Sequence, residues 1–129
     1  MPRFVGRIDQ VPPAYSAIKV AGVRAYRLAR ADQPVVLQSR QVDVKSLTLC
    51  EIIDADQAAF EVTCGKGLYV RSLARDLAQA LGTQGYVAAL RRTRVGPFQA
   101  KAAIPLDKLE VLGHSAAFPE HLLPVETAL

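Results

Sequence analysis

A change of hydrophobic period in the middle of the chain constrains the fold most. Over Ala58–Cys64, apolar and polar residues alternate, which is typical of a strand with one buried face. Gly65-Lys66-Gly67 then interrupts the pattern. From Tyr69 to Leu81 the apolar residues recur at three- and four-residue spacing, which predicts an amphipathic helix that ends at Gly82. This segment therefore predicts a strand, a tight turn and a helix that packs on the sheet.

The remaining segments predict more strands than helices. We expect strands over 3–10, 34–37, 41–53 and about 90–95, an extended stretch over 15–20, and short helices over 24–30 and 105–112. Pro12-Pro13 ends the first strand, because proline has no N–H to donate to a ladder. The strand over 41–53 forms a hairpin with 58–64. The order predicts an α+β fold with a mixed, largely antiparallel sheet and one main helix.

Composition argues against several classes of protein. No apolar run approaches the ~20 residues that span a bilayer, and the first residues lack the pattern of a secretory signal. Cys50 and Cys64 are too few for a disulfide scaffold or a four-ligand zinc site, and His114 and His121 lie far from them in the sequence. We therefore expect a reduced, cytoplasmic protein with no metal site and no membrane contact.

The distribution of charge favours a polyanionic partner. The chain has 16 Lys and Arg against 12 Asp and Glu, a net charge of +4. The cations cluster in residues 1–30 and 64–101, while 31–63 and the tail from 102 are acidic. Two basic segments that converge in the fold would form a positive face on which phosphate contacts dominate affinity. Charge alone leaves open a solvated surface without a partner.

Two residues stand in unusual surroundings. Tyr15 follows the rigid Pro12-Pro13 pair and lies beside Lys19, as a base-stacking aromatic near a cation would; a half-buried core tyrosine is the alternative. Arg71 lies in the first turn of the predicted helix, where the helix dipole disfavours a cation. Its position indicates a specific acidic partner, although a solvated arginine is also consistent with the sequence.

Other motifs have simpler interpretations. Gly65-Lys66-Gly67 before a helix could bind phosphate, but it lacks the spacing of a P-loop and favours a plain turn. In Arg91-Arg92-Thr93-Arg94, a strand would place Arg92 and Arg94 on one face and Arg91 on the other. No Ser-His-Asp, Cys-His or metal-ligating constellation is apparent. The residues therefore predict a nucleic-acid-binding face without a nucleophile.

Several runs in the same order resemble a known family. They include Tyr15-Ser16-Ala17, Gly67-Leu68-Tyr69-Val70-Arg71 and Leu90-Arg91-Arg92, each within a longer matching stretch. Together they resemble the second half of the catalytic domain of the TruB family of tRNA pseudouridine synthases. The resemblance implies that 1–111 is the C-terminal half of a pseudouridine synthase catalytic domain, and that 112–129 is a linker or the start of the C-terminal region.

The resemblance also implies an activity. The family converts the T-loop uridine (position 55 in tRNA nomenclature) to pseudouridine without a cofactor, by detaching the uracil, rotating it and rejoining it through C5. The target base is flipped out of the loop. By this likeness Tyr15 stacks on the uracil, Tyr69 lies against the target base, Arg71 pairs with the catalytic aspartate and Leu90 lines the pocket. The candidates for contact with the RNA backbone of the T-arm are Lys19, Arg24, Lys66, Arg91 and Arg92.

The chain departs from the family pattern in one essential respect. The family's nucleophilic aspartate lies in a Gly-x-Leu-Asp-Pro-x-Ala-Thr-Gly loop, and the sequence contains no such segment. Leu68 also replaces a threonine that is common in the family. We therefore expect a piece of the enzyme that is inactive alone and that self-associates through an open sheet edge. Two alternatives remain: a non-catalytic RNA-binding module that uses the same basic face, and a small structural domain with solvated cations.

Overall fold

The computed structural model describes residues 2–20, 22–31, 37–113 and 122–128. The chain divides into two units, Met1–Ala88 and Ala89–Leu129, and each is described by itself.

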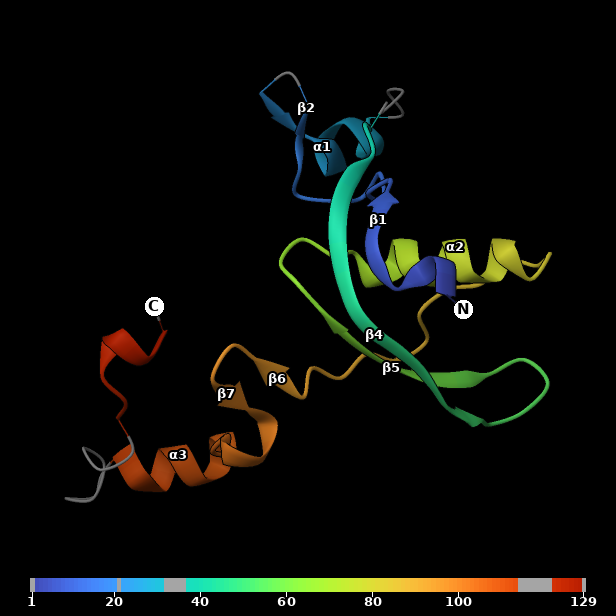
Figure 1. Ribbon diagram of the computed structural model, residues 1–129. Helices are drawn as coiled ribbons and strands as arrows, with labels where there is room; N and C mark the ends of the chain where they lie inside the picture. The colour runs from blue at the N-terminus through green and yellow to red at the C-terminus, as the bar shows by residue number, and fades with distance from the viewer. Residues whose placement is uncertain (1, 21, 32–36, 114–121, 129) are drawn as a thin grey trace. The chain divides into compact units, whose positions relative to one another are not determined.

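A three-stranded antiparallel sheet forms the frame of the first unit (Figure 1). Its order is β1 (Gly6–Gln10), β4 (Arg40–Ile52) and β5 (Ala58–Cys64), so the longest strand lies in the centre. A short 3-10 turn, η1 (Pro2–Phe4), precedes β1. On β4, Val42 and Val44 are buried while Asp43 between them is exposed, which is the alternation expected of a strand with one face on the core.

The main helix, α2 (Val70–Ala80), crosses β1 in Figure 1 and buries Ser72, Leu73 and Ala78. Gly67 at φ +87° makes the turn that leads into it. At the other end, Gly85 passes so close to the helix that a Cβ built on it would lie 2.8 Å from the Cβ of Ala78. Only glycine fits this approach, so the segment after α2 can pack against the helix.

A small subdomain joins β1 to β4. It comprises β2 (Lys19–Val20) and β3 (Val23–Arg24), which pair around Gly22 at φ +84°, and the helix α1 (Ala25–Arg30). The N–H of Ala25 donates to the carbonyl of Ile18 at 2.6 Å, and the N–H of Tyr26 donates to the carbonyl of Ser16 at 3.1 Å. These bonds tie the start of α1 to the segment that leads into the hairpin.

The second unit is built from short elements. β6 (Arg94–Val95) pairs with β7 (Phe98–Gln99) around Gly96 at φ +57°. A 3-10 turn, η2 (Ala100–Ala102), and the helix α3 (Leu106–Gly113) follow, and η4 (Val125–Ala128) lies near the end of the chain.

The α+β class, the antiparallel pairing and the main helix are confirmed. The hairpin predicted over 41–53 and 58–64 and the helix predicted over 24–30 are present within one residue at each end. Two predictions were too long: the first strand begins only at Gly6, and Ala14–Ala17 forms a bend rather than an extended stretch. Of the strand predicted over 34–37, residues 34–36 lie outside the described residues, and Leu37 belongs to no strand.

The predicted strand over 90–95 is wrong for residues 90–93. Strands need a partner, and here the partner turns into η2 immediately after Gln99. The ladder therefore stops at the bond from the N–H of Ala100 to the carbonyl of Thr93, at 2.8 Å. Consequently Arg91 and Arg92 lie in irregular backbone, and the prediction that Arg92 shares a strand face with Arg94 is wrong.

Candidate functional site

The end of β1 is hydrogen-bonded to the start of α2. The N–H of Tyr69, the residue before the first helical turn, donates to Oε1 of Gln10 at 2.8 Å. Gln10 is only 1% exposed. A helix begins with N–H groups that lack partners inside the helix, and Tyr69 offers no side-chain cap of its own. The buried carboxamide therefore fixes the backbone of Tyr69.

Two further side chains of α2 fix the same junction. The hydroxyl of Ser72 donates to the carbonyl of Val11 at 2.7 Å, and Nη2 of Arg75 donates to the same oxygen at 3.2 Å. Arg75 also forms an ion pair with Asp76 at 2.7 Å. Because Ser72 is 1% exposed, its bond is shielded from water and ties the helix to the chain that follows β1.

Arg71 joins this junction to the segment that carries Tyr15. Its Nη2 donates to the backbone carbonyl of Tyr15 at 2.8 Å. The ring of Tyr15 is 57% exposed, Tyr69 is half-buried and Arg71 is exposed. The structure thus brings together three of the predicted site residues, from segments 56 positions apart in the sequence. The bond reaches the backbone of Tyr15, so it leaves the exposed ring available for stacking.

The acidic partner expected for Arg71 is not among the described residues. There the ion pair of Arg75 with Asp76 is the one salt bridge, and Arg71 bonds to a carbonyl instead. One hydrogen bond leaves further donors of the guanidinium available, since arginine has five N–H groups. A carboxylate opposite Arg71 stays a prediction.

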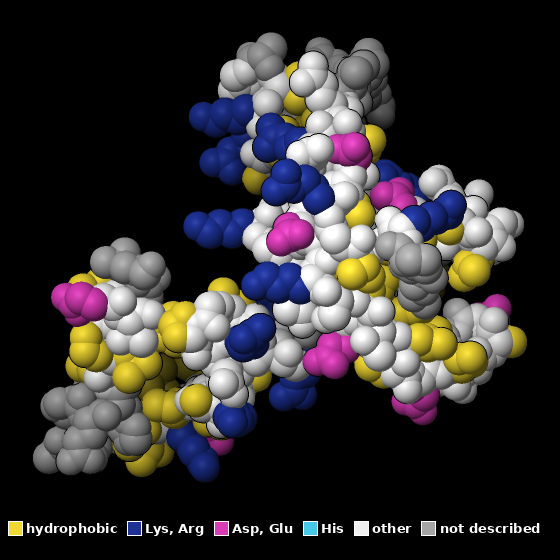
Figure 2. Space-filling model, viewed as in Figure 1, with side chains coloured by type: hydrophobic (Ala, Val, Ile, Leu, Met, Phe, Trp, Pro, Cys, Tyr) yellow, Lys and Arg dark blue, Asp and Glu magenta, His cyan; other side chains and the backbone are white. Residues whose placement is uncertain are grey.

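The predicted contacts to the RNA backbone fall into two groups. Lys19 and Arg24 are directly opposite each other on β2 and β3, and Lys66 is exposed in the turn before α2. Figure 2 shows Lys and Arg side chains gathered where Figure 1 places the subdomain of β2, β3 and α1. The second group, Arg91 and Arg92, lies in the second unit and is exposed, as is Leu90. That these residues act together with the first group stays a prediction.

The turn over Gly65–Gly67 uses one of its backbone donors within the fold. The N–H of Gly65 donates to the carbonyl of Asp43 on β4 at 2.8 Å, so this donor is used within the fold. The side chain of Lys66 is exposed in this turn, and the preference for a plain turn over a phosphate loop stays a prediction. Among the residues that the structure describes, no group of three or more His, Cys, Asp or Glu could hold a metal ion, and no helix is long and apolar enough to cross a membrane.

Sequence reasoning missed Gln10 and Ser72, the two buried polar residues that build the junction. Polar residues at the end of a strand and in the first turn of a helix are common on surfaces. The only signal was that Ser72 lies one position before the buried Leu73 in the helical stripe. Their partners are more than 55 residues away in the sequence, so only the fold reveals the contacts.

Comparison with known proteins identifies the family of the chain. Residues 1–70 match the model of the TruB family pseudouridylate synthase N-terminal domain, and 71–129 match that of the tRNA pseudouridylate synthase B C-terminal domain. The two matches together extend over the whole chain, and the first alone covers more than half of it. The chain belongs to the TruB family.

Proteins named tRNA pseudouridine synthase B match nearly the whole chain. The tRNA pseudouridine synthase B of Rhodospirillum rubrum is 58% identical over 127 residues, which cover 98% of this chain and 41% of that protein. The protein of the same name from Bradyrhizobium diazoefficiens is 55% identical over 134 residues, covering 100% of this chain and 39% of that protein. The chain thus spans about two fifths of the length of these relatives.

A solved structure supports the same family. In a crystal structure of a Cbf5-Nop10-Gar1 complex, one chain superimposes with a TM-score of 0.73 at 30% identity, over 97% of this chain and 35% of that one. The two family models meet at 70/71, whereas the structural units meet at 88/89. The boundary predicted at 111/112 stays a prediction.

Proposed function

We propose that the chain is part of a tRNA pseudouridine synthase that isomerises the T-loop uridine at position 55 to pseudouridine. The observation that carries the proposal is the junction of β1 with α2, which holds Tyr69 and Arg71 beside Tyr15 in a chain of the TruB family. The T-arm of tRNA is the proposed partner, in the cytoplasm. The free thiols of Cys50 and Cys64, both exposed, suit a reducing compartment.

Each site residue has a role in the proposed reaction. Tyr69 lies against the target uracil while the glycosidic bond breaks and the ring rotates to rejoin through C5. Arg71 pairs with the nucleophilic carboxylate and lowers the cost of its charge. Tyr15 stacks on the flipped base, and Leu90 adds an apolar wall. Lys19, Arg24, Lys66, Arg91 and Arg92 contact phosphates, which raises affinity without reading sequence.

The chain alone is expected to make no pseudouridine, because it carries no Gly-x-Leu-Asp-Pro loop. The measurement is tritium release from tRNA labelled with [5-³H]uridine. The positive control is the R. rubrum relative with its 127 matching residues replaced by those of this chain, here termed the exchange protein. Release by the chain alone would contradict the prediction.

The same assay tests the T-loop. A tRNA transcript with cytidine in place of uridine at position 55 is expected to abolish release by the exchange protein, while its binding persists. Release from that transcript would contradict T-loop specificity. If the exchange protein binds tRNA but releases no tritium from any transcript, a non-catalytic RNA-binding module is the better account.

We also propose that the isolated chain self-associates. Within the described residues, β1 and β5 are the edges of the three-stranded sheet, and β5 carries the exposed ring of Phe60. An uncovered edge offers unpaired N–H and C=O groups to a second strand. Light scattering is expected to show a dimer at high concentration, and Phe60→Lys to shift the chain towards monomer. A clean monomer of the unaltered chain would count against self-association.

A further inference from the structure

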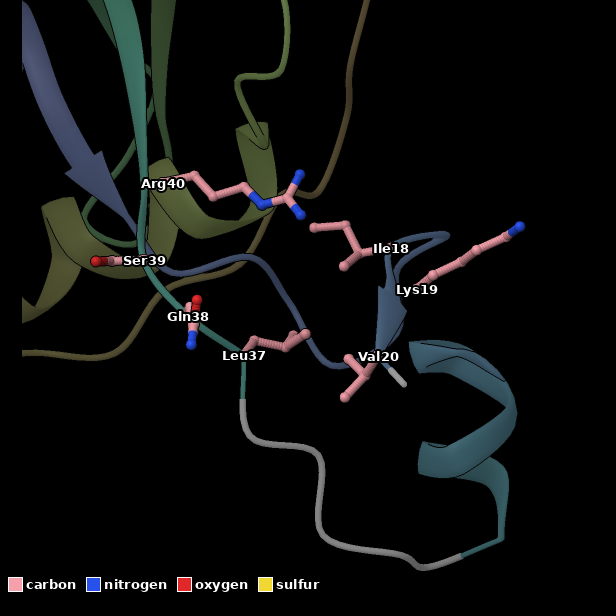
Figure 3. A pocket seen from close by; sticks show the side chains of 7 residues that line it. All are labelled: Ile18, Lys19, Val20, Leu37, Gln38, Ser39 and Arg40. Atoms are coloured by element: carbon pink, nitrogen blue, oxygen red, sulfur yellow. The ribbon is translucent and has the colours of Figure 1, made fainter. Parts of the chain in front are cut away.

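A slot opens between the β2–β3 hairpin and the residues that lead into β4. Its volume is about 270 Å³, and Ile18, Lys19, Val20, Leu37 and Arg40 are among its lining residues. In Figure 3, Leu37 and Val20 point toward each other from opposite walls, and Arg40 extends from β4 toward Ile18. The slot therefore has two facing aliphatic side chains and a guanidinium at one end, and Gln38 and Ser39 complete its lining.

The cation of this slot is the guanidinium of Arg40. Across the residues described, no hydrogen bond, ion pair or ring contact involves the Arg40 guanidinium. The ammonium of Lys19 extends away from the slot, and Lys19 is directly opposite Arg24 in the hairpin. The Arg40 guanidinium is therefore the cation that the slot presents to an anion.

Size and chemistry together indicate the occupant. Sites for whole small ligands have volumes of ~300–1,000 Å³, so about 270 Å³ suits one small group. A nucleobase is flat, packs against aliphatic walls and stacks on guanidinium planes. A nucleotide also brings a phosphate, which is a partner for the Arg40 guanidinium. The slot thus matches both halves of one nucleotide.

We propose that this slot binds one unpaired nucleotide of the RNA substrate, with its base between Val20 and Leu37 and its phosphate on Arg40. The proposal rests on the proposed function, because it takes RNA as the substrate. Sequence reasoning missed Arg40, which lies in the acidic stretch of the chain and was not distinguished by any motif. The slot is a binding site apart from Tyr69 and Arg71.

The test compares two charge removals on one strand. Arg40→Gln is expected to weaken binding of a T-arm hairpin RNA by the chain about tenfold, as loss of a hydrogen bond to a charged group does. It should also reduce the slope of log affinity against log salt by about 0.7. Lys45→Gln removes the same charge five residues further along β4, ~17 Å away, and is expected to weaken binding less than about threefold.

A second pair of variants separates the base from the phosphate. Leu37→Ala is expected to weaken hairpin binding about fivefold, as loss of part of a stacking surface does. Leu49→Ala, at an exposed leucine of β4, is expected to have no effect. Neither variant should alter binding of a fully paired RNA of the same length. Circular dichroism and the urea midpoint confirm that each variant is folded.

A methyl NMR titration with uridine 5′-monophosphate identifies the source of the nucleotide. Shifts at Val20 and Leu37 that inorganic phosphate does not produce, at lower affinity than the hairpin RNA, support the proposal. Equal shifts with phosphate would overturn the base site, and a mononucleotide as tight as the hairpin would overturn its assignment to RNA.

The variants also distinguish this proposal from the function on which it rests. Equal losses from Arg40→Gln and Lys45→Gln would overturn the slot while leaving salt-dependent RNA binding intact. Absence of RNA binding by both the unaltered chain and the exchange protein would overturn the slot and the proposed function together.

Discussion

Arg71→Lys in the exchange protein is expected to lower kcat for pseudouridine formation about 10²-fold, with tRNA affinity nearly unchanged. The arginine donates to the carbonyl of Tyr15 at 2.8 Å and keeps further N–H groups for a carboxylate. Lysine is a point charge on a flexible stem and cannot hold both partners in one geometry. Single-turnover tritium release measures the chemical step separately from binding.

The control for Arg71→Lys is Arg7→Lys. Arg7 is exposed on β1, opposite Asp43 on β4, and belongs to neither the junction nor the slot. We expect its replacement to change kcat less than about twofold, since substitutions at exposed positions away from the site have small effects. If Arg71→Lys retained the kcat of the unaltered exchange protein, the role given to Arg71 would be wrong.

Gln10→Met is expected to lower the free energy of unfolding of the chain by about 1–3 kcal/mol. Methionine has a similar shape but no acceptor for the N–H of Tyr69, which Oε1 of Gln10 accepts at 2.8 Å. Nε2 of Gln10 has no partner among the described residues, so its removal costs nothing there. Urea unfolding measures the stability, and amide exchange at Tyr69 reports the lost bond.

Gln41→Met is the matched control, because Gln41 is exposed on β4 opposite Asp9. Its effect on the free energy of unfolding is expected to stay within about 0.5 kcal/mol. In the exchange protein, Gln10→Met should also lower kcat, since the backbone of Tyr69 loses its anchor. Equal stability of the two variants, together with unchanged exchange at Tyr69, would show that Gln10 does not fix the junction.

Local pattern predicted the elements whose signal lies within the element itself. The alternation over 58–64 and the apolar stripe from Val70 to Leu77 gave β5 and α2 nearly at their observed ends. The strand over 90–93 failed because a ladder also needs a partner, and the partner turns into η2 after Gln99. Strand content therefore depends on segments that periodicity alone does not reveal.

The site was predictable only in part. The motifs pointed to Tyr15, Tyr69 and Arg71, and the structure brings the three together through the bond of Arg71 to the Tyr15 carbonyl. Gln10 and Ser72 were missed because their importance comes from burial and from partners across the fold. Arg40 was missed because its neighbours in the slot come from the hairpin, not from β4.

The central claim is that this chain supplies the base-holding half of a pseudouridine synthase site. The most direct measurement is tritium release from tRNA labelled with [5-³H]uridine by the exchange protein, with the modified position mapped in the product. The account predicts that the exchange protein releases tritium and forms pseudouridine at position 55. Over the time that the unaltered exchange protein needs for this, the Arg71→Lys variant should do neither. A folded exchange protein that binds tRNA and yields no pseudouridine would contradict it.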